Sequence, residues 1–248
     1  MTEQRRESLL QNLRDAGCAG SAARQIVTEP EMISGPIAEE SPAPPAEEPP
    51  SAAPENERTL WCKREEQTMG KHVLIVSSSL RGKSNSELLA KEAERGAKDA
   101  GHEVELVSLK DKDIRFCKGC LACQRTGKCV IQDDVQDIME KIQNAEVVVF
   151  VTPIYYYELS GQLKTLLDRC NPLFPQEYRF REIYLITTSA EDGDEVSQRA
   201  VNGLKGWIEC FPKCRFAGAY SGGGVNEPAE VSGRTDLLDG AYHLGHSL

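Results

Sequence analysis

The sequence predicts an α/β fold over residues 70–248, with a doubly wound, five-stranded parallel sheet. Val73–Val76 and Val147–Val151 are short runs of apolar, mostly β-branched residues, which are typical of strands buried on both faces of a sheet. Segments with apolar residues at helical spacing alternate with such runs along the chain. This alternation is the pattern of βαβ units, whose strands run parallel.

The other elements follow the same alternation. His102–Leu109 is expected to form a second strand near an edge, Ile183–Ile186 a fourth and Arg215–Tyr220 a weaker fifth. Five such units favour the flavodoxin-like strand order 2-1-3-4-5, which places a ligand at the carboxyl ends of strands 1 and 3. The expected helices are marked by apolar residues at helical spacing: Leu89, Ala93, Ala97 and Ala100; Val135, Ile138, Met139 and Ile142; Leu163, Leu166, Leu167 and Cys170; Val196, Ala200, Leu204 and Ile208; Leu237, Ala241, Leu244 and Leu248.

Residues 1–69 are expected to lie outside this domain. Residues 1–28 have a short helical pattern that is too small to build a core of its own. Residues 29–69 are expected to form a disordered linker, because a segment rich in Pro, Glu and Ala buries too little surface to offset the entropy lost on ordering. Met69 directly precedes the first strand and is an alternative start for the chain.

The composition and charge of the chain bear on its partners, its location and the role of its cysteines. The formal net charge is −10 and there is no basic block, so a nucleic-acid partner is not expected. No apolar run approaches the roughly 20 residues of a membrane span, so no membrane association is expected. The N-terminus lacks the apolar core of a signal peptide, which favours a cytoplasmic location. Nine cysteines in such a setting indicate metal or redox chemistry rather than disulfides.

The loop after the first strand has the features of a phosphate site. It leads directly into a helix, whose free N–H groups and positive dipole end favour an anion. Neither GxGxxG nor GxxxxGK followed by Ser or Thr occurs here, which disfavours dinucleotides and nucleoside triphosphates and favours a phosphate monoester such as that of FMN. An ordinary polar loop with a helix cap is the alternative. The loop carries Ser77, Ser78, Ser79, Arg81, Ser84, Asn85 and Ser86, whose hydroxyls, amide and guanidinium could add hydrogen bonds to the phosphate.

Two further loops are expected at the same edge of the sheet. Tyr155, Tyr156 and Tyr157 follow the third strand, where a planar ring could be held by stacking and by backbone hydrogen bonds. The polar loop Thr187–Gly193 follows the fourth strand and is expected to lie along the other side of such a ring. Tyrosines that cap the core or line an oligomer interface are the alternative interpretation. We therefore expect the loops after strands 1, 3 and 4 to form one site.

A compact cysteine motif follows the second strand, and it consists of Cys117, Cys120, Cys123 and Cys129. Closely spaced cysteines of this kind can wrap one iron–sulfur cluster, and no second group of cysteines is available to share it, so the motif favours a single [4Fe–4S] cluster. Zinc is disfavoured, because its four-cysteine sites usually consist of two separate CxxC pairs. Four free thiols, without a metal, are the third interpretation.

These motifs resemble a known family. SSSLRGKSNS, FCKGCLACQRTGKCVIQDD, VTPIYYYELSGQLKTLLDR and TTSAED are similar, in that order and spacing, to segments of the flavodoxin-like NAD(P)H-dependent FMN reductase family, and in particular to its iron–sulfur flavoproteins. The resemblance covers residues 70–248 and implies FMN as a cofactor. It implies that the phosphate is held by Ser79, Arg81, Ser84, Asn85 and Ser86. It implies a ring site made by Pro153, Ile154, Tyr155, Tyr156 and Tyr157, with Ser189 and Ala190.

Two functional hypotheses follow. The first is an FMN-dependent oxidoreductase that moves electrons from NAD(P)H or a reduced ferredoxin to an acceptor, with the [4Fe–4S] cluster as a relay. The second is a flavodoxin-like electron carrier or redox sensor without a small-molecule substrate. No catalytic acid or base is assigned. The resemblance implies a homodimer or homotetramer, and the cysteine segment is expected at the carboxyl edge of the sheet or over the flavin site of a neighbouring subunit.

Overall fold

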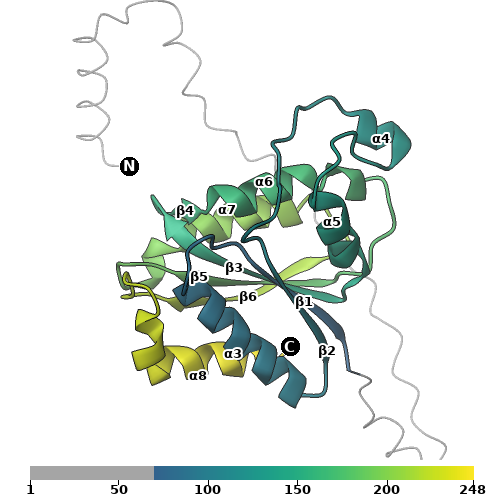
Figure 1. Ribbon diagram of the computed structural model, residues 1–248. Coiled ribbons are helices and arrows are strands. Elements are labelled where there is room, and N and C mark those ends of the chain that lie inside the picture. Colours follow the sequence, from purple (N-terminus) through teal and green to yellow (C-terminus); the bar gives the residue numbers. More distant parts are fainter. Residues whose placement is uncertain (1–69) are drawn as a thin grey trace, which may run out of the picture. The chain divides into compact units, whose positions relative to one another are not determined.

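The computed structural model describes residues 70–248, so the expected helical segment, the linker and Met69 lie outside the described residues. A parallel sheet with the strand order β2-β1-β3-β5-β6 forms its centre (Figure 1). Its strands are β1 (His72–Ser77), β2 (Glu103–Ser108), β3 (Val147–Tyr155), β5 (Glu182–Thr188) and β6 (Arg215–Gly222). The predicted fold and strand order are confirmed.

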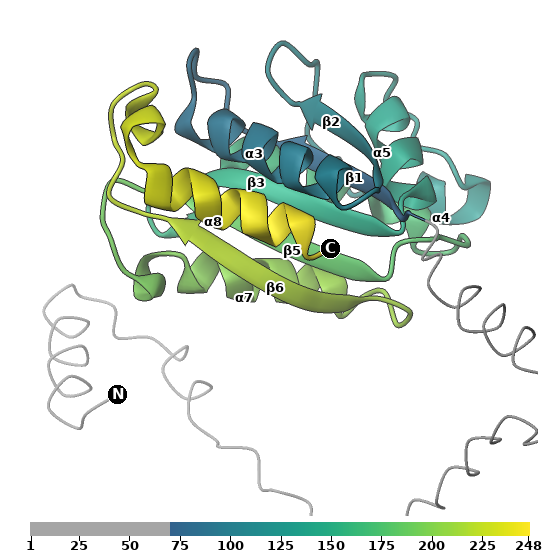
Figure 2. The ribbon, with the colours of Figure 1, turned by 90° about the horizontal axis from the view of Figure 1, so that it is seen from below.

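Helices cover both faces of the sheet (Figures 1 and 2). One face carries α3 (Asn85–Asp99) and α8 (Thr235–His246), and the other carries α5 (Val135–Asn144), α6 (Gly161–Arg169) and α7 (Gln198–Ile208). Right-handed crossovers between parallel strands produce this doubly wound arrangement. None of the helices in residues 70–248 has the length and apolar character that crossing a membrane requires.

The side chains of β1 show why the sheet has a core on each face. Leu74 and Val76 pack against the helices α5, α6 and α7, whereas Val73 and Ile75 pack against α3 and α8. All four are completely buried, as the unbroken apolar run predicted. β2 is only partly buried, which agrees with its expected place at an edge.

The structure adds elements that the sequence patterns did not predict. β3 extends beyond the expected Val151 to Tyr155, and β4 (Glu158–Leu159) turns back to pair antiparallel with its end. The tyrosine segment is therefore a β-hairpin rather than an irregular loop. A short helix, α4 (Ala122–Thr126), lies inside the cysteine motif. The remaining short helical turns are η2 (Asn171–Leu173), η3 (Asp194–Val196) and η4 (Glu230–Gly233).

Two glycines allow α3 and α8 to pack with their backbones almost in contact. A Cβ atom placed on Gly96 of α3 would lie 2.1 Å from the carbonyl oxygen of Tyr242, and one on Gly245 of α8 would lie 2.0 Å from that of Ala93. Backbone carbonyls cannot move away as the end of a flexible side chain can. The packing of this helical layer therefore requires glycine at both positions.

We expect Gly96→Ala to lower the free energy of unfolding by about 1–3 kcal/mol, the usual cost of overpacking a filled interior. Gly206 of α7 is the matched control, because no atom lies within 4 Å of a Cβ placed there. Gly206→Ala should leave stability unchanged or raise it by up to about 1 kcal/mol, since alanine is the better helix former. Urea unfolding of both variants tests this. Equal stability of the two would contradict the close packing of α3 on α8.

Candidate functional site

The loop after β1 is tied to the neighbouring strand and helix by its serines. The hydroxyl of Ser78 lies 3.2 Å from the carbonyl oxygen of Val151 and 2.9 Å from the hydroxyl of Ser160. Ser160 is the N-cap of α6, so this contact joins the first loop to the beginning of that helix. Ser79 is also buried, and its hydroxyl accepts a hydrogen bond from the backbone N–H of Arg81. The loop is consequently held at the carboxyl edge of the sheet.

The beginning of α3 fits the predicted anion site. Ser84 is the N-cap, and its hydroxyl accepts a 3.3 Å hydrogen bond from the backbone N–H of Glu87. The hydroxyls of Ser86 and Thr188 lie 2.6 Å apart, which joins the first turn of α3 to the end of β5. Ser77, the last residue of β1, has a buried hydroxyl without a hydrogen-bond partner in the described chain.

Residues 226–231 complete this edge, and sequence reasoning did not identify them. The Asn85 side-chain amide donates to the carbonyl oxygen of Glu227 at 2.9 Å and accepts from the N–H of Val231 at 3.2 Å. The Arg81 guanidinium donates to the carbonyl oxygen of Asn226. Arg81 and Asn85 therefore hold this segment in the structure, and both keep further N–H donors for a phosphate: several on the Arg81 guanidinium and one on the Asn85 amide. The sequence gives no local signal for the pairing.

The tyrosine hairpin has an unusual backbone. Tyr156 and Tyr157 form its two-residue turn, with φ angles of 50° and 65°. Such turns ordinarily use Asn-Gly or Asp-Gly, because both central residues need positive φ. Left-handed backbone at non-glycine residues costs about 1–3 kcal/mol each and is concentrated at functional sites. Tyr156 is also 97% exposed. The hairpin thus presents an aromatic ring to solvent at an energetic cost.

Tyr157 connects this hairpin to the loop after β5. Its hydroxyl donates to the Glu191 carboxylate, 3.0 and 3.1 Å from the two oxygens, and the Arg199 guanidinium lies 5.7 Å from its ring centre. The hydrogen bond to Glu191, together with its negative charge, raises the pKa of the Tyr157 phenol. Ser189 donates to the carbonyl oxygen of Glu191 at 2.7 Å. The tyrosine hairpin and the loop after β5, which are both predicted to face a ring, therefore contact each other.

The residues predicted to bind FMN thus come together at one edge. They follow β1, β3 and β5, whose carboxyl ends are adjacent in the sheet. Pro153 and Ile154 lie in the end of β3 and are partly buried, whereas Ala190 is exposed in the loop after β5. A cavity of about 320 Å³ opens beside the first loop, between Leu80, Phe116 and the beginning of α6. The hydroxyls, helix N-terminus and aromatic surface have the chemistry that a flavin phosphate and ring require.

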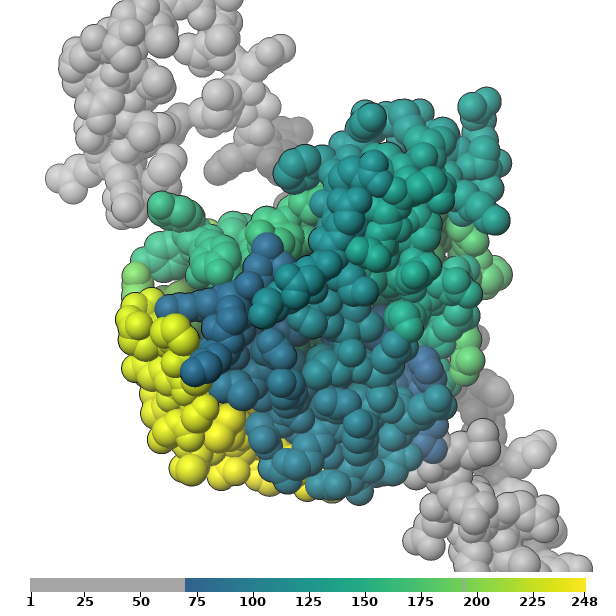
Figure 3. All heavy atoms as spheres, viewed as in Figure 1, coloured from purple at the N-terminus to yellow at the C-terminus, as the bar shows by residue number. Residues whose placement is uncertain are grey.

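The cysteine motif lies at a second place, over the carboxyl ends of α6 and α7. The teal segment that carries it stands out from the sheet in Figures 1 and 3. All four motif cysteines line one cavity of about 400 Å³. Cys170 and Cys210, which the sequence left outside the motif, line it too. Within residues 70–248, no three His, Cys, Asp or Glu residues are positioned to hold a metal ion. The four thiols thus line one cavity, but their sulfur atoms are not arranged to bind a metal ion.

Two N–H groups point at sulfur atoms of the motif. The side-chain amide of Asn171 donates to Cys123 Sγ at 3.2 Å, and the backbone N–H of Gly119 donates to Cys117 Sγ at 3.4 Å. Cys123 is buried, while Cys117 and Cys120 are exposed. Hydrogen bonds of this kind stabilise negative charge on sulfur. They fit thiolate ligands of a cluster better than four neutral thiols.

A buried arginine holds the cysteine segment. Arg169 ends α6 and is 1% exposed, and its guanidinium donates to the two carboxylate oxygens of Asp133 at 2.6 and 2.9 Å. It also donates to the carbonyl oxygens of Arg115 at 2.7 Å and Ile131 at 3.3 Å. Arg115, Ile131 and Asp133 flank the four cysteines, so one side chain fixes both ends of the segment. Removing either partner of a buried ion pair costs about 3–5 kcal/mol.

The electrostatics of this pair also favour an anionic group beside it. Burial lowers the pKa of Arg169, but the hydrogen bond to Asp133 and the charge of Cys129 outweigh it, so that the pKa lies above its ordinary value. For Asp133, burial raises the pKa, and hydrogen bonds from Arg169, Arg115 and Val135 lower it below the ordinary value. The Arg169 Nε group is buried without a partner in residues 70–248. An anionic cluster at Cys129 would suit this donor.

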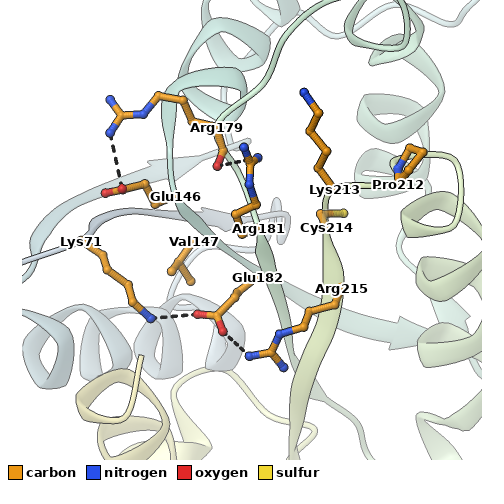
Figure 4. Close-up of a pocket in the computed structure, with 10 residues that line it drawn as sticks. All are labelled: Lys71, Glu146, Val147, Arg179, Arg181, Glu182, Pro212, Lys213, Cys214 and Arg215. Atoms are coloured by element: carbon orange, nitrogen blue, oxygen red, sulfur yellow. Dashed lines mark hydrogen bonds and ion pairs between the residues drawn. The ribbon is translucent and has the colours of Figure 1, made fainter. Parts of the chain in front are cut away.

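Another cavity, of about 730 Å³, lies elsewhere in the described chain. Its lining residues, drawn in Figure 4, include Lys71, Val147, Glu182 and Arg215, which lie at the amino ends of strands. Its basic side chains are already paired: Lys71 lies 2.8 Å from Glu182, and Arg179 lies 3.5 Å from Glu146. The adjacent Cys214 has its pKa raised to about 11 by burial. This cavity therefore has surface ion pairs rather than the groups of a redox site.

Comparison with known proteins identifies relatives of part of the chain. An iron–sulfur flavoprotein of Methanocaldococcus jannaschii is 41% identical over 101 residues, which are 41% of this chain and 52% of that protein. An iron–sulfur flavoprotein of Archaeoglobus fulgidus is 36% identical over 108 residues, 44% of this chain and 53% of that protein. The chain spans about half the length of these curated relatives.

Solved structures agree with the fold. An NAD(P)H:quinone oxidoreductase from Methanothermobacter marburgensis superimposes with a TM-score of 0.57 and 17% identity, over 72% of this chain and 96% of that one. A family model described as NADPH-dependent FMN reductase matches residues 72–214, more than half of the chain. The resemblance stated from the sequence motifs is thereby confirmed. The chain belongs to the NADPH-dependent FMN reductase family, and it is similar to the iron–sulfur flavoproteins over about half of their length.

Proposed function

We propose that the protein is an FMN-dependent oxidoreductase that passes electrons from NAD(P)H or a reduced ferredoxin to an acceptor, with a [4Fe–4S] cluster as a relay. The proposal rests on the position of α6 between the two candidate sites. α6 begins at Ser160, which contacts the predicted flavin loop, and ends at Arg169, which holds the cysteine segment. A nine-residue helix is about 13 Å long. The two sites thus lie at opposite ends of one short, rigid element.

At the carboxyl edge, the residues have separate tasks in holding FMN. The hydroxyls of Ser79 and Ser86, the first turn of α3 and the Arg81 guanidinium would bind the phosphate. The end of β3 and the tyrosine hairpin would hold the ring, and the loop with Ser189 and Ala190 would close its other side. When bound, the flavin supplies the redox chemistry, and no side-chain nucleophile is required.

At the cysteine segment, Cys117, Cys120, Cys123 and Cys129 would ligate the cluster. The shared cavity, the N–H donors at two sulfurs and the buried guanidinium support this assignment. Lys118 and Lys128 add positive charge to the segment. The relatives named as iron–sulfur flavoproteins support it as well. Zinc or free thiols are outcomes that would contradict it.

The cellular location and the oligomeric state are parts of the same proposal. All seven cysteines of residues 70–248 are free, which agrees with a reducing, cytoplasmic location. We assign the redox function to residues 70–248 and leave residues 1–69 without a role in it. We also propose a homodimer or homotetramer, which rests on the family resemblance.

The decisive test is an anaerobic absorption spectrum of freshly purified protein, with FMN, iron and acid-labile sulfide counted on the same sample. We expect flavin bands and about four irons and four sulfides per chain, as a [4Fe–4S] cluster requires. Rapid oxidation of NAD(P)H would then identify the donor, whereas reduction by ferredoxin or dithionite alone would favour an electron carrier. Absence of flavin after addition of FMN would overturn the proposal.

Arg81→Gln should weaken the binding of FMN roughly tenfold, because a charge-assisted hydrogen bond contributes about 1.5 kcal/mol or more. Riboflavin lacks the phosphate, so its affinity should not change. Lys91→Gln is the control for overall charge: Lys91 lies on α3, 3.0 Å from Glu87 and outside the loop. Fluorescence titration measures all three affinities. An equal loss for FMN and riboflavin would show that Arg81 does not contact the phosphate.

Alkylation by iodoacetamide at pH 8 should distinguish cluster ligands from free thiols. In protein stripped of iron, the exposed Cys117, Cys120 and Cys210 should react. Cys170 should not, because burial raises the pKa of its thiol to about 12. In protein that holds iron and sulfide, only Cys210 of these four should react, as the control outside the motif. Peptide mass spectrometry measures the modification. Equal labelling of Cys117 with and without iron would exclude it as a ligand.

A further inference from the structure

The turn after α6 contacts the cysteine segment through two side-chain amides. Asn171 donates to Cys123 Sγ at 3.2 Å, and Gln176 donates to the carbonyl oxygen of Gly127 at 2.8 Å. Both residues are half-buried and lie within a few positions of each other. They differ in the atom they meet: one amide contacts a sulfur of the motif and the other contacts the backbone. The Asn171 amide can therefore affect the charge on a sulfur atom, whereas the Gln176 amide can only hold the backbone.

The acceptor of the Asn171 bond is placed where the bond can affect charge on the sulfur. Cys123 is the most buried cysteine of the motif, at 8% exposure, so water competes little for its sulfur. Hydrogen bonds to the sulfur ligands of an iron–sulfur cluster are among the features that set its reduction potential. A donor stabilises the more negative, reduced form more than the oxidised form. The amide has no ionisable group, so its effect does not depend on pH.

We propose that Asn171 is a positioning residue that raises the reduction potential of the iron–sulfur cluster through its hydrogen bond to Cys123. This inference rests on the proposed function, because it needs a cluster at the four cysteines. Arg169 has a different role. Its positive charge is paired with Asp133, so it mainly fixes the segment, whereas Asn171 acts on a ligand atom directly.

The test is a redox titration of the iron-loaded protein monitored by electron paramagnetic resonance. Asn171→Ala should make one-electron reduction of the cluster several-fold to tenfold less favourable, and tenfold corresponds to about 59 mV. Gln176→Ala is the matched control, because it removes an amide of the same turn that does not meet sulfur; it should change the equilibrium less than twofold. The flavin potential, read optically on the same samples, should not move in either variant.

The outcomes separate this inference from the proposed function. Wild-type protein without iron and sulfide would overturn both. Iron-loaded Asn171→Ala with an unchanged cluster potential would overturn the role of Asn171 alone. If that variant does not retain iron, Asn171→Ser, which keeps a donor, and Asn171→Leu, which has no donor and no charge, supply the comparison. The Leu variant should have the lower potential, and equal potentials in these two would contradict the proposal.

Discussion

The buried ion pair between Arg169 and Asp133 is the interaction on which the cysteine segment depends. A buried guanidinium needs acceptors for its donors, and here a carboxylate and two carbonyl oxygens accept from Nη1 and Nη2, whereas Nε has no partner in residues 70–248. These acceptors come from both ends of the segment. The five residues from Phe116 to Cys120 all lie on the surface with little core of their own. Arg169 of α6 therefore fixes the ends of the segment, together with the hydrogen bonds that join Asp113 and Arg115 to Asp133 and Asp134.

α6 has a second consequence for function, because its two ends serve different sites. Its N-cap, Ser160, shares a hydrogen bond with the loop after β1, and its last residue and the turn beyond it contact the cysteines. The helix packs on the sheet through Leu163 and Leu166, which are fully buried. A rigid connection of this kind fixes the separation of the two sites. Any electron transfer within one chain would therefore cross a distance that the core packing sets.

The two candidate sites differ in how their structure is stabilised. The flavin edge combines buried serines with a strained hairpin, in which Tyr156 and Tyr157 adopt a backbone that glycine usually provides. Contacts from Glu191 and Arg199 to Tyr157 help to hold that turn. The cysteine segment has little strain of this kind apart from Leu121, whose φ is 56°. The energetic cost of the cysteine segment is electrostatic instead, because the charges of Arg169 and Asp133 are buried there.

The sequence by itself determined the sheet order, the edge where the loops meet and the cysteine motif. Apolar periodicity and motif spacing are local along the chain, so they can be recognised without a structure. Only the tertiary structure decided which side chains support those sites. Asn171 lies 48 residues from Cys123, Arg169 lies 36 from Asp133, and Asn85 lies 142 from Glu227. Such pairs depend on how the helices and loops pack in space, and no single segment of sequence contains both partners.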